Sequence, residues 1–226
     1  MLYHLLGTLS ACAFLLTWYG LAHQWLVIER KKREIGKATA SLSTNQFASS
    51  FFAFYANFIF GIAISPFNHY LVWTRLGALI LILLILFRIW QDRHNRTVKW
   101  VFITALCALT LGLVSMLFRP YEGIAQLGAN GLMLVVTAIL VQGTLHQWLT
   151  LRRAKTVGTL SSHLFRSILI KDLTTLAFAL TMPISIAWPL LVLNGASVVT
   201  RGGLLIQMEI MKRESGSRLL AVFEQF

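Results

Sequence analysis

Seven apolar stretches dominate this sequence, and they restrict the chain to a membrane-spanning fold. They lie at about residues 3–28, 46–66, 69–90, 100–118, 125–150, 167–187 and 188–211. A helix needs about 20 mostly apolar residues to cross the hydrocarbon of a bilayer, and each stretch is close to that length. Only 12% of the 226 residues are charged, against the roughly 25% that is usual in soluble domains. We therefore predict an all-α integral membrane protein with seven transmembrane helices.

Prolines set two of the predicted boundaries. Pro66 ends the second stretch in a tight turn. The boundary between the sixth and seventh stretches is placed near Ile186 and Pro189, because proline favours a helix break and a new helix start. Pro183 is then an internal proline of the sixth span. Residues 214–226 are too short for an eighth span and are predicted to form a cytosolic tail, either an interfacial helix or a disordered segment.

The net charge of +12 is concentrated in short segments between the apolar stretches. Basic residues follow the first, third, fifth and seventh stretches, whereas the segments on the opposite side contain only Arg119. This imbalance places the basic side in the cytosol, so we predict an external N-terminus and a cytosolic C-terminus. Charge distributed in this way argues against a basic face for nucleic acid. A chain this compact suggests a bacterial cytoplasmic membrane.

A heptapeptide occurs twice, at the ends of the first and fifth stretches. Gly20–Leu26 (GLAHQWL) matches Gly143–Leu149 (GTLHQWL) at five of seven positions with an offset of 123, and basic residues follow both copies. The alternative explanation is that both are helix ends at a membrane interface, where Trp and basic residues are common. That alternative leaves the Gly and the His-Gln pair unexplained, so we interpret the motif as the trace of a duplication.

The duplication divides the chain into a 3+1+3 arrangement. Residues 1–95 form the first three-helix repeat, residues 96–122 a linker helix, residues 123–213 the second repeat, and residues 214–226 the tail. A direct copy of three helices would be inserted upside down, yet both copies place basic residues after their first helix. The linker helix therefore restores the direction, which predicts two parallel three-helix repeats with a cleft between them.

With these motifs the chain resembles the SWEET/PQ-loop superfamily of seven-span membrane proteins. The family pattern is a Pro-Gln near the end of the first helix of each repeat, then basic residues, then a Gly with a nearby Ser or Thr. The last helix of the family is rich in Asn. The matching residues here are Gln24 and Gln147, Gly36 with Thr39, Gly158 with Ser161, and Asn194, Gly195, Gly203 and Gln207 in the seventh stretch.

His23 and His146 replace the signature prolines in both repeats. Proline permits a kink in a helix and histidine does not, so the chain lacks hinges that the rocking motion of SWEET proteins uses. Two histidines near the cytosolic face could titrate between pH 5 and 8 and couple protons to a solute. The alternative is that each donates a hydrogen bond to a neighbouring helix carbonyl.

The resemblance implies a solute site near the midplane, between the two repeats. SWEET proteins place a sugar-contacting Asn in the seventh helix opposite an aromatic residue of the sixth. Asn194 and Phe178 take these positions, and Leu76 and Asn57 are their counterparts in the first repeat. Alternatively, Asn194 and Asn57 form interhelical hydrogen bonds that contribute only about 0.6 kcal/mol each.

Arg201 lies near the middle of the seventh stretch, where a charge costs about 2.5–3.5 kcal/mol unless it is paired or hydrated. Asp172 in the sixth stretch is the natural partner, and Glu209 is another candidate. The pair Arg201 and Asp172 could form a cytosolic gate or a proton site, or a static bridge between the last two spans. Arg75 lies near the outer end of the third stretch and is expected to snorkel to the interface without a functional role.

No catalytic or metal-binding pattern occurs in the sequence, which lacks Gly-x-Ser-x-Gly, His-Glu-x-x-His and P-loop motifs. Cys12 and Cys107 are predicted to be small core residues. We therefore predict a non-enzymatic transporter of a small polar solute, foremost a sugar-like metabolite, without cofactor or metal. Its partners are the solute and the lipid bilayer, and a homo-oligomer is compatible with this interpretation. The alternative is a PQ-loop-fold receptor or assembly subunit that transports nothing.

Overall fold

The computed structural model describes residues 1–35, 39, 44–119, 123–154 and 162–223, which are helical almost throughout. The helices are α1 (Leu2–Ile35), α2 (Thr44–Ala63), α3 (His69–Arg93), α4 (Arg96–Ser115), the 3₁₀-helix η1 (Met116–Phe118), α5 (Gly123–Ala154), α6 (Ser162–Ala179) and α7 (Ile184–Phe223). No strand occurs in these ranges, so the prediction of an all-α fold is confirmed.

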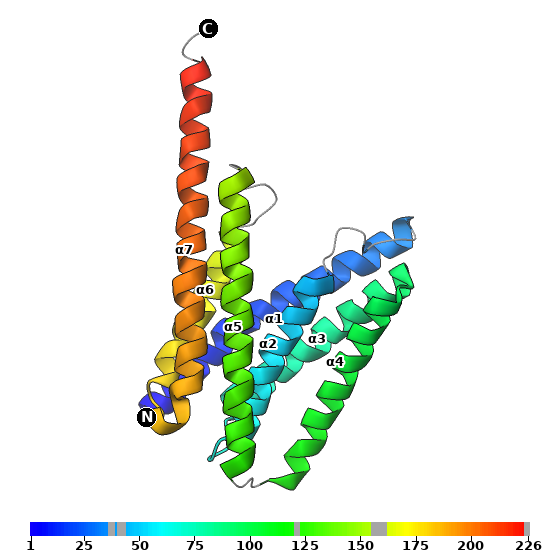
Figure 1. Ribbon diagram of the computed structural model, residues 1–226, viewed down its shortest axis with the longest axis vertical. Helices are drawn as coiled ribbons and strands as arrows, with labels where there is room; N and C mark the ends of the chain where they lie inside the picture. Colours follow the sequence, from blue (N-terminus) through cyan, green and yellow to red (C-terminus); the bar gives the residue numbers. More distant parts are fainter. Residues whose placement is uncertain (36–38, 40–43, 120–122, 155–161, 224–226) are drawn as a thin grey trace.

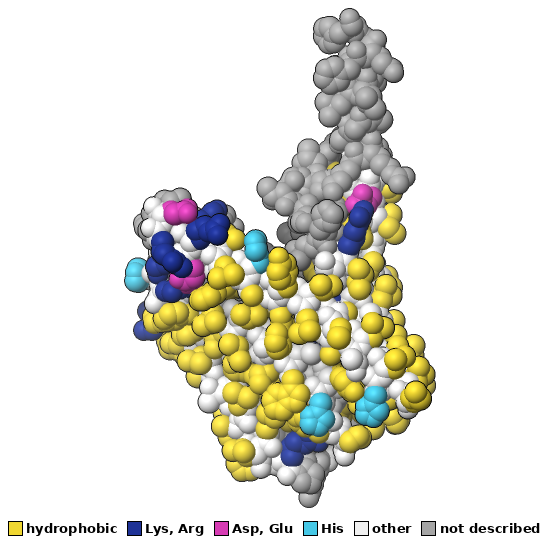
Figure 2. Space-filling view, turned by 180° about the vertical axis from the view of Figure 1, so that it is seen from behind, with side chains coloured by type: hydrophobic (Ala, Val, Ile, Leu, Met, Phe, Trp, Pro, Cys, Tyr) yellow, Lys and Arg dark blue, Asp and Glu magenta, His cyan; other side chains and the backbone are white. Residues whose placement is uncertain are grey.

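Several helices are long and apolar enough to cross a membrane. Among the described residues these are Leu2–Glu34, His69–Arg93, Arg96–Phe118, Gln126–Leu145 and Ile184–Met211. The apolar segment found in α2, Phe47–Ala63, is shorter. Large hydrophobic side chains are exposed along the helices, and Figure 2 shows them as a broad belt below the charged side chains at the upper end. An exposed apolar surface of this extent is suited to lipid, so the chain is a membrane protein.

Six helices form a ring in which each packs against its two neighbours. The order around the ring is α1, α3, α2, α5, α7 and α6, and α6 returns to α1. Helix α4 lies outside the ring against α2 and α3. Both α1 and α5 begin at the lower end of Figure 1 and rise toward its upper end with different tilts. The ring therefore brings together helices that are distant in sequence, α1 with α6 and α2 with α5.

The break between the last two helices lies before Pro183 rather than at Pro189. The N–H groups of Thr181 and Met182 bond to carbonyls three residues earlier, which closes α6. The Pro183 carbonyl then accepts two hydrogen bonds from the first turn of α7. A proline suits this position because its missing N–H would have no helical partner there. Pro189 lies inside α7, so the predictions for both prolines are wrong.

Helices α1 and α7 continue furthest beyond their predicted spans. Helix α1 includes the basic run Arg30–Arg33, and α7 extends through most of the predicted tail as one continuous helix. Ion pairs with α3 hold the end of α1, because Arg88 Nε lies 2.5 Å from Glu29 Oε1 and Lys32 Nζ lies 3.7 Å from Asp92 Oδ1. The basic run at the end of α1 thus adds charged contacts to the packing of α1 against α3.

The two cysteines are exposed, Cys12 on α1 and Cys107 on α4. The prediction that both lie in the core is wrong. A thiol is only weakly polar, so a lipid-facing position suits it as well as a core position does. Residue type alone could not distinguish these two apolar environments.

Candidate functional site

Asp172 on α6 is the centre of a group of buried and half-buried charges, and its side chain is 2% exposed. Its Oδ1 lies 2.7 Å from Lys171 Nζ, and its Oδ2 lies 3.4 Å from Arg201 Nη1 of α7. The Ser197 hydroxyl on α7 donates a hydrogen bond to the same Oδ2. Both carboxylate oxygens thus have the partners that a buried charge requires. The contact between Arg201 and Asp172 expected from the sequence is one part of this group.

Arg75 on α3 adds a further buried cation. Its Cζ lies 4.3 Å from the ring centroid of Phe14 on α1, and Lys171 Nζ lies 5.7 Å from the same centroid. Arg75 Nη1 donates to Thr74 Oγ1 at 2.7 Å, whereas its Nε has no hydrogen-bond partner among the described residues. Arg75 and Lys171 thus share the Phe14 ring, and Lys171 is paired with Asp172. We call Arg75, Lys171, Asp172, Ser197 and Arg201 the charge cluster.

The charge cluster lies beside the contact of α1 with α6. Ser10 Oγ of α1 and Thr175 Oγ1 of α6 are 3.1 Å apart and buried. One turn further along α1 is Phe14, and one turn back along α6 is Lys171, whose Nζ lies over the Phe14 ring. Consecutive turns of the two helices therefore contact each other in antiparallel order, first through hydroxyl groups and then through a cation and an aromatic ring.

Arg75 and Lys171 are members of this site that were not predicted from the sequence. The expectation that Arg75 snorkels is wrong, since the side chain lies inside the bundle over Phe14 with 2% of its surface exposed. A guanidinium group can stack on an aromatic face, which offsets part of the cost of burial. For Lys171 a signal was present, because two adjacent charges in an apolar stretch are costly unless they are paired.

The residues predicted to bind solute are buried. Asn194 and Asn57 each donate their amide to a main-chain carbonyl four residues earlier in their own helix, at 2.8 and 2.9 Å. Phe178 is packed among aromatic rings, with its centroid 5.1 Å from that of Tyr3 and 5.6 Å from that of Tyr70. These contacts are compatible with both hypotheses for the two amides, a solute site or helix packing.

Of the two copies of the signature His-Gln pair, the structure describes the side chains of the first copy only. His23 is exposed on α1, with its ring centroid 6.3 Å from that of Tyr19, and Gln24 is half-buried. Thr39 is buried, and its carbonyl accepts a hydrogen bond from Arg93 Nη2 at 2.6 Å. The side chains of His146 and Gln147, together with Gly36, Gly158 and Ser161, lie outside the described residues. The pairing of the two histidines therefore stays a prediction.

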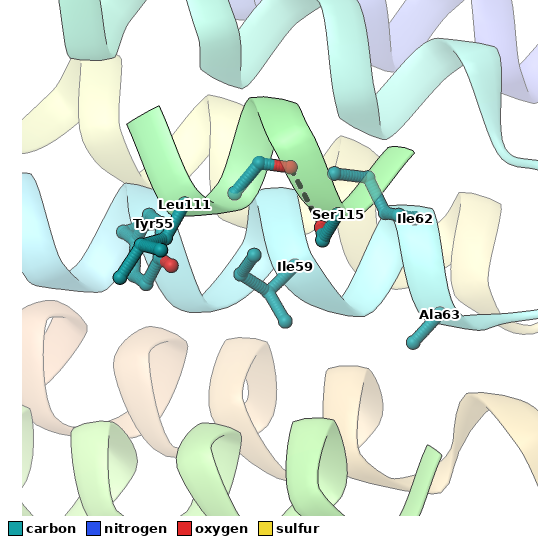
Figure 3. Close-up of a pocket in the computed structure, with 7 residues that line it drawn as sticks. Tyr55, Ile59, Ile62, Ala63, Leu111 and Ser115 are labelled. Atoms are coloured by element: carbon teal, nitrogen blue, oxygen red, sulfur yellow. Dashed lines mark hydrogen bonds between the residues drawn. The ribbon is translucent and has the colours of Figure 1, made fainter. Parts of the chain in front are cut away.

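Two surface cavities lie close to the ring of helices. A cavity of about 250 Å³ lies between the ends of α2 and α6 and is lined by Tyr3, Ile64, Ser65, Pro66, Thr181, Met182, Pro183 and Ile186. A cavity of about 300 Å³ lies between α2 and α4 and is mostly apolar (Figure 3). In Figure 3 the Ser115 hydroxyl bonds to the Gly112 carbonyl of its own helix at 2.7 Å. The first cavity is the better candidate for a solute path, because it lies between helices of both predicted repeats.

No protein-family model matches the chain, and no curated protein matches it. Its chemistry must therefore be inferred from the geometry of the site. No three His, Cys, Asp or Glu side chains come together as metal ligands within the described ranges. The charge cluster instead offers hydrogen-bond donors, which suit the acceptor oxygens of a solute.

Proposed function

We propose that this chain is a membrane transporter of a small polar solute, which passes between two three-helix units. The first unit is α1–α3, the second is α5–α7, and α4 is the linker, so that all seven helices span the membrane. The charge cluster carries the proposal, because Arg75 comes from the first unit and Lys171, Asp172 and Arg201 come from the second. Buried charges are costly in a membrane and commonly mark the path of a substrate or an ion.

The helix contacts support the repeat. In the proposed repeat, α1 corresponds to α5, α2 to α6 and α3 to α7. The contact of α1 with α3 then corresponds to that of α5 with α7, and the contact of α2 with α3 corresponds to that of α6 with α7. The contact of α1 with α6 becomes that of α5 with α2, and all of these contacts occur. This correspondence, with α1 and α5 rising in the same direction in Figure 1, supports two parallel units around an axis along the membrane normal.

In our proposal the N-terminus is outside and the C-terminus is in the cytosol of a bacterial cell. The basic ends of α1 and α3 then lie on the cytosolic side, as positive-inside topology requires. The cavity between the ends of α2 and α6 opens to the outside. The hydrogen bond between Ser10 and Thr175 then lies between that cavity and Lys171 and closes the path in this conformation.

A disulfide across the α1–α6 contact tests the proposal. With native Cys12 and Cys107 replaced by Ala, the substitutions Ser10→Cys and Thr175→Cys place two sulfur atoms where the hydroxyl oxygens are 3.1 Å apart. Proteoliposomes are supplied with a panel of labelled sugars, amino acids and organic anions. We expect flux of at least one solute, its loss on oxidation and its recovery with a reductant, while Ser10→Cys alone stays active.

Two outcomes would count against the proposal. Flux that continues in fully oxidised protein contradicts passage between the two units. No flux of any solute in the cysteine-free protein favours the rival function, a receptor or assembly subunit in which the ion pair of Arg201 and Asp172 is a static bridge.

A further inference from the structure

The charge cluster contains three cations, Arg75, Lys171 and Arg201, but one carboxylate, Asp172. We propose that it binds the carboxylate or phosphate group of a small anionic solute. This inference rests on the proposed transport function and names the class of solute. It differs from the sugar-like solute that the family resemblance implied, because a neutral sugar would leave the excess positive charge in place.

The excess positive charge is largely shielded from solvent, which favours an anion as the ligand. The exposed fraction of the Lys171 side chain is 13%, that of Arg201 is 24%, and Arg75 is 2% exposed. Asp172 balances one of these charges. Taking an uncompensated charge out of water is unfavourable, and a site that keeps two is stabilised by a ligand of opposite charge.

The contacts of Arg75 give a second argument for an anion. It forms no ion pair among the described residues, and its buried Nε has no hydrogen-bond partner. Phe14 covers one face of the guanidinium group and Thr74 Oγ1 accepts a hydrogen bond from Nη1, so Nε is the buried donor left for a ligand in the same plane. A planar group of this kind binds carboxylate or phosphate oxygens through two parallel hydrogen bonds.

Lys171 and Arg201 are held by Asp172, so they act on the anion in a different way. The ammonium nitrogen of Lys171 lies 2.7 Å from Asp172 Oδ1 and 5.7 Å from the centroid of the Phe14 ring, which Arg75 also contacts. An anion on Arg75 is therefore close to a second positive charge without having to displace Asp172. Asp172 is a positioning residue that also weakens anion binding through its own charge.

A lipid phosphate is the other source of the same chemistry. The 2% exposure of Arg75 argues against it, because a lipid headgroup could reach this side chain only after the bundle had opened. A small soluble anion requires a narrower opening between the helices than a lipid headgroup does.

Binding is measured on the full chain in maltoside detergent, which contains no phosphate. Inorganic phosphate, acetate and succinate are added at constant ionic strength, glucose serves as the neutral probe, and the ligand-induced rise of Tm gives Kd. A short-chain phosphatidylglycerol tests the lipid. We expect at least one of the soluble anions to raise Tm, and glucose to leave it unchanged.

Substitutions of the cations and of the carboxylate should change the Kd for the anion in opposite directions. Arg75→Gln should weaken anion binding by about tenfold or more, as for the loss of a charge-assisted hydrogen bond. Asp172→Asn should strengthen it, since one negative charge is removed. Arg166→Gln is the matched control, because it removes a cation of α6 from an exposed ion pair with Glu209 and should leave Kd unchanged. Lys171→Gln replaces Arg75→Gln if that variant does not fold.

The outcomes separate this inference from the proposed function. Anion binding that depends on Arg75 or Lys171 supports the inference even if no flux is found. Flux of neutral solutes without anion binding overturns it and leaves transport in place. Tm rises with phosphatidylglycerol alone, or equal Kd values in Arg75→Gln, Lys171→Gln and Arg166→Gln, also overturn it.

Discussion

Ser10 on α1 and Thr175 on α6 share a hydrogen bond of 3.1 Å between their hydroxyl oxygens, although 165 residues separate them in sequence. Both side chains are buried, and both lie one turn from a residue of the Phe14–Lys171 contact. The first and second predicted repeats therefore meet through polar groups at this place. In lipid such a contact is directional, and it fixes how the two helices lie against each other.

Removing this hydrogen bond should weaken the contact of α1 with α6. We expect the combined substitutions Ser10→Ala and Thr175→Val to lower the free energy of unfolding by about 1 kcal/mol. A double-mutant cycle in mixed micelles measures the coupling between the two side chains. Thr110→Val is the control, since this exposed hydroxyl bonds to a carbonyl of its own helix. A coupling of zero would contradict the direct contact.

The contact of α1 with α3 should be sensitive to one methyl group. A Cβ on Gly77 would lie 2.1 Å from Trp18 Cζ2, and Trp18 Nε1 donates to the Thr74 carbonyl at 2.6 Å. Gly77→Ala should therefore cost about 1–3 kcal/mol through overpacking. Gly131→Ala in α5 meets nothing within 4 Å and should be neutral or stabilise by about 0.5–1 kcal/mol. Equal thermal stabilities of the two variants would contradict the close approach.

The sequence predicts those features of this molecule that a single segment determines, and it predicts less well those that depend on how two segments contact each other. The all-helical fold follows from hydropathy, because the backbone of a span must satisfy its hydrogen bonds within the helix. The start of α7 cannot be predicted in this way, because Pro183 and Pro189 are equally good markers of a helix start in the sequence. Only the main-chain hydrogen bonds of Thr181 and Met182 show that the break lies before Pro183. A local pattern therefore predicts a span more reliably than its end.

The candidate site was also only partly predictable from local sequence patterns. The pairing of Arg201 with Asp172 could be expected because each is a rare charge in an apolar stretch. The direction of Arg75 depends on Phe14, which belongs to another helix and carries no sign of this contact in its own neighbourhood. A contact between distant helices is visible only when the ring of helices is known.

Asp172 should contribute more to stability than any surface carboxylate. Asp172→Asn leaves Lys171 and Arg201 without their buried counter-charge and should cost about 3 kcal/mol. Glu209→Gln is the matched control, because the ion pair of Glu209 with Arg166 is partly exposed and should be worth about 0–1 kcal/mol. Unfolding in mixed micelles measures both, and equal losses would argue against a buried charge cluster.

Measurements of stability and of KM for uptake distinguish whether the amide of Asn194 serves helix packing or solute binding. Its donor bond stays within α7, so Asn194→Ala should lower stability by about 0.6 kcal/mol or less. If the amide also contacts solute, KM for uptake rises while stability changes little. Asn57→Ala is the counterpart on α2 with the same type of bond. An unchanged KM in both variants assigns the two amides to packing.

The proposed orientation predicts which loops an impermeant reagent reaches. Ser65, in the turn after α2, and Arg96, at the start of α4, are both exposed, and they lie at opposite ends of α3. In protein without native cysteines, Ser65→Cys should react with a charged maleimide in intact cells. Arg96→Cys should react only after the membrane is opened, since basic segments stay in the cytosol. The reverse pattern would invert the proposed topology, and the cavity between α2 and α6 would then face the cytosol.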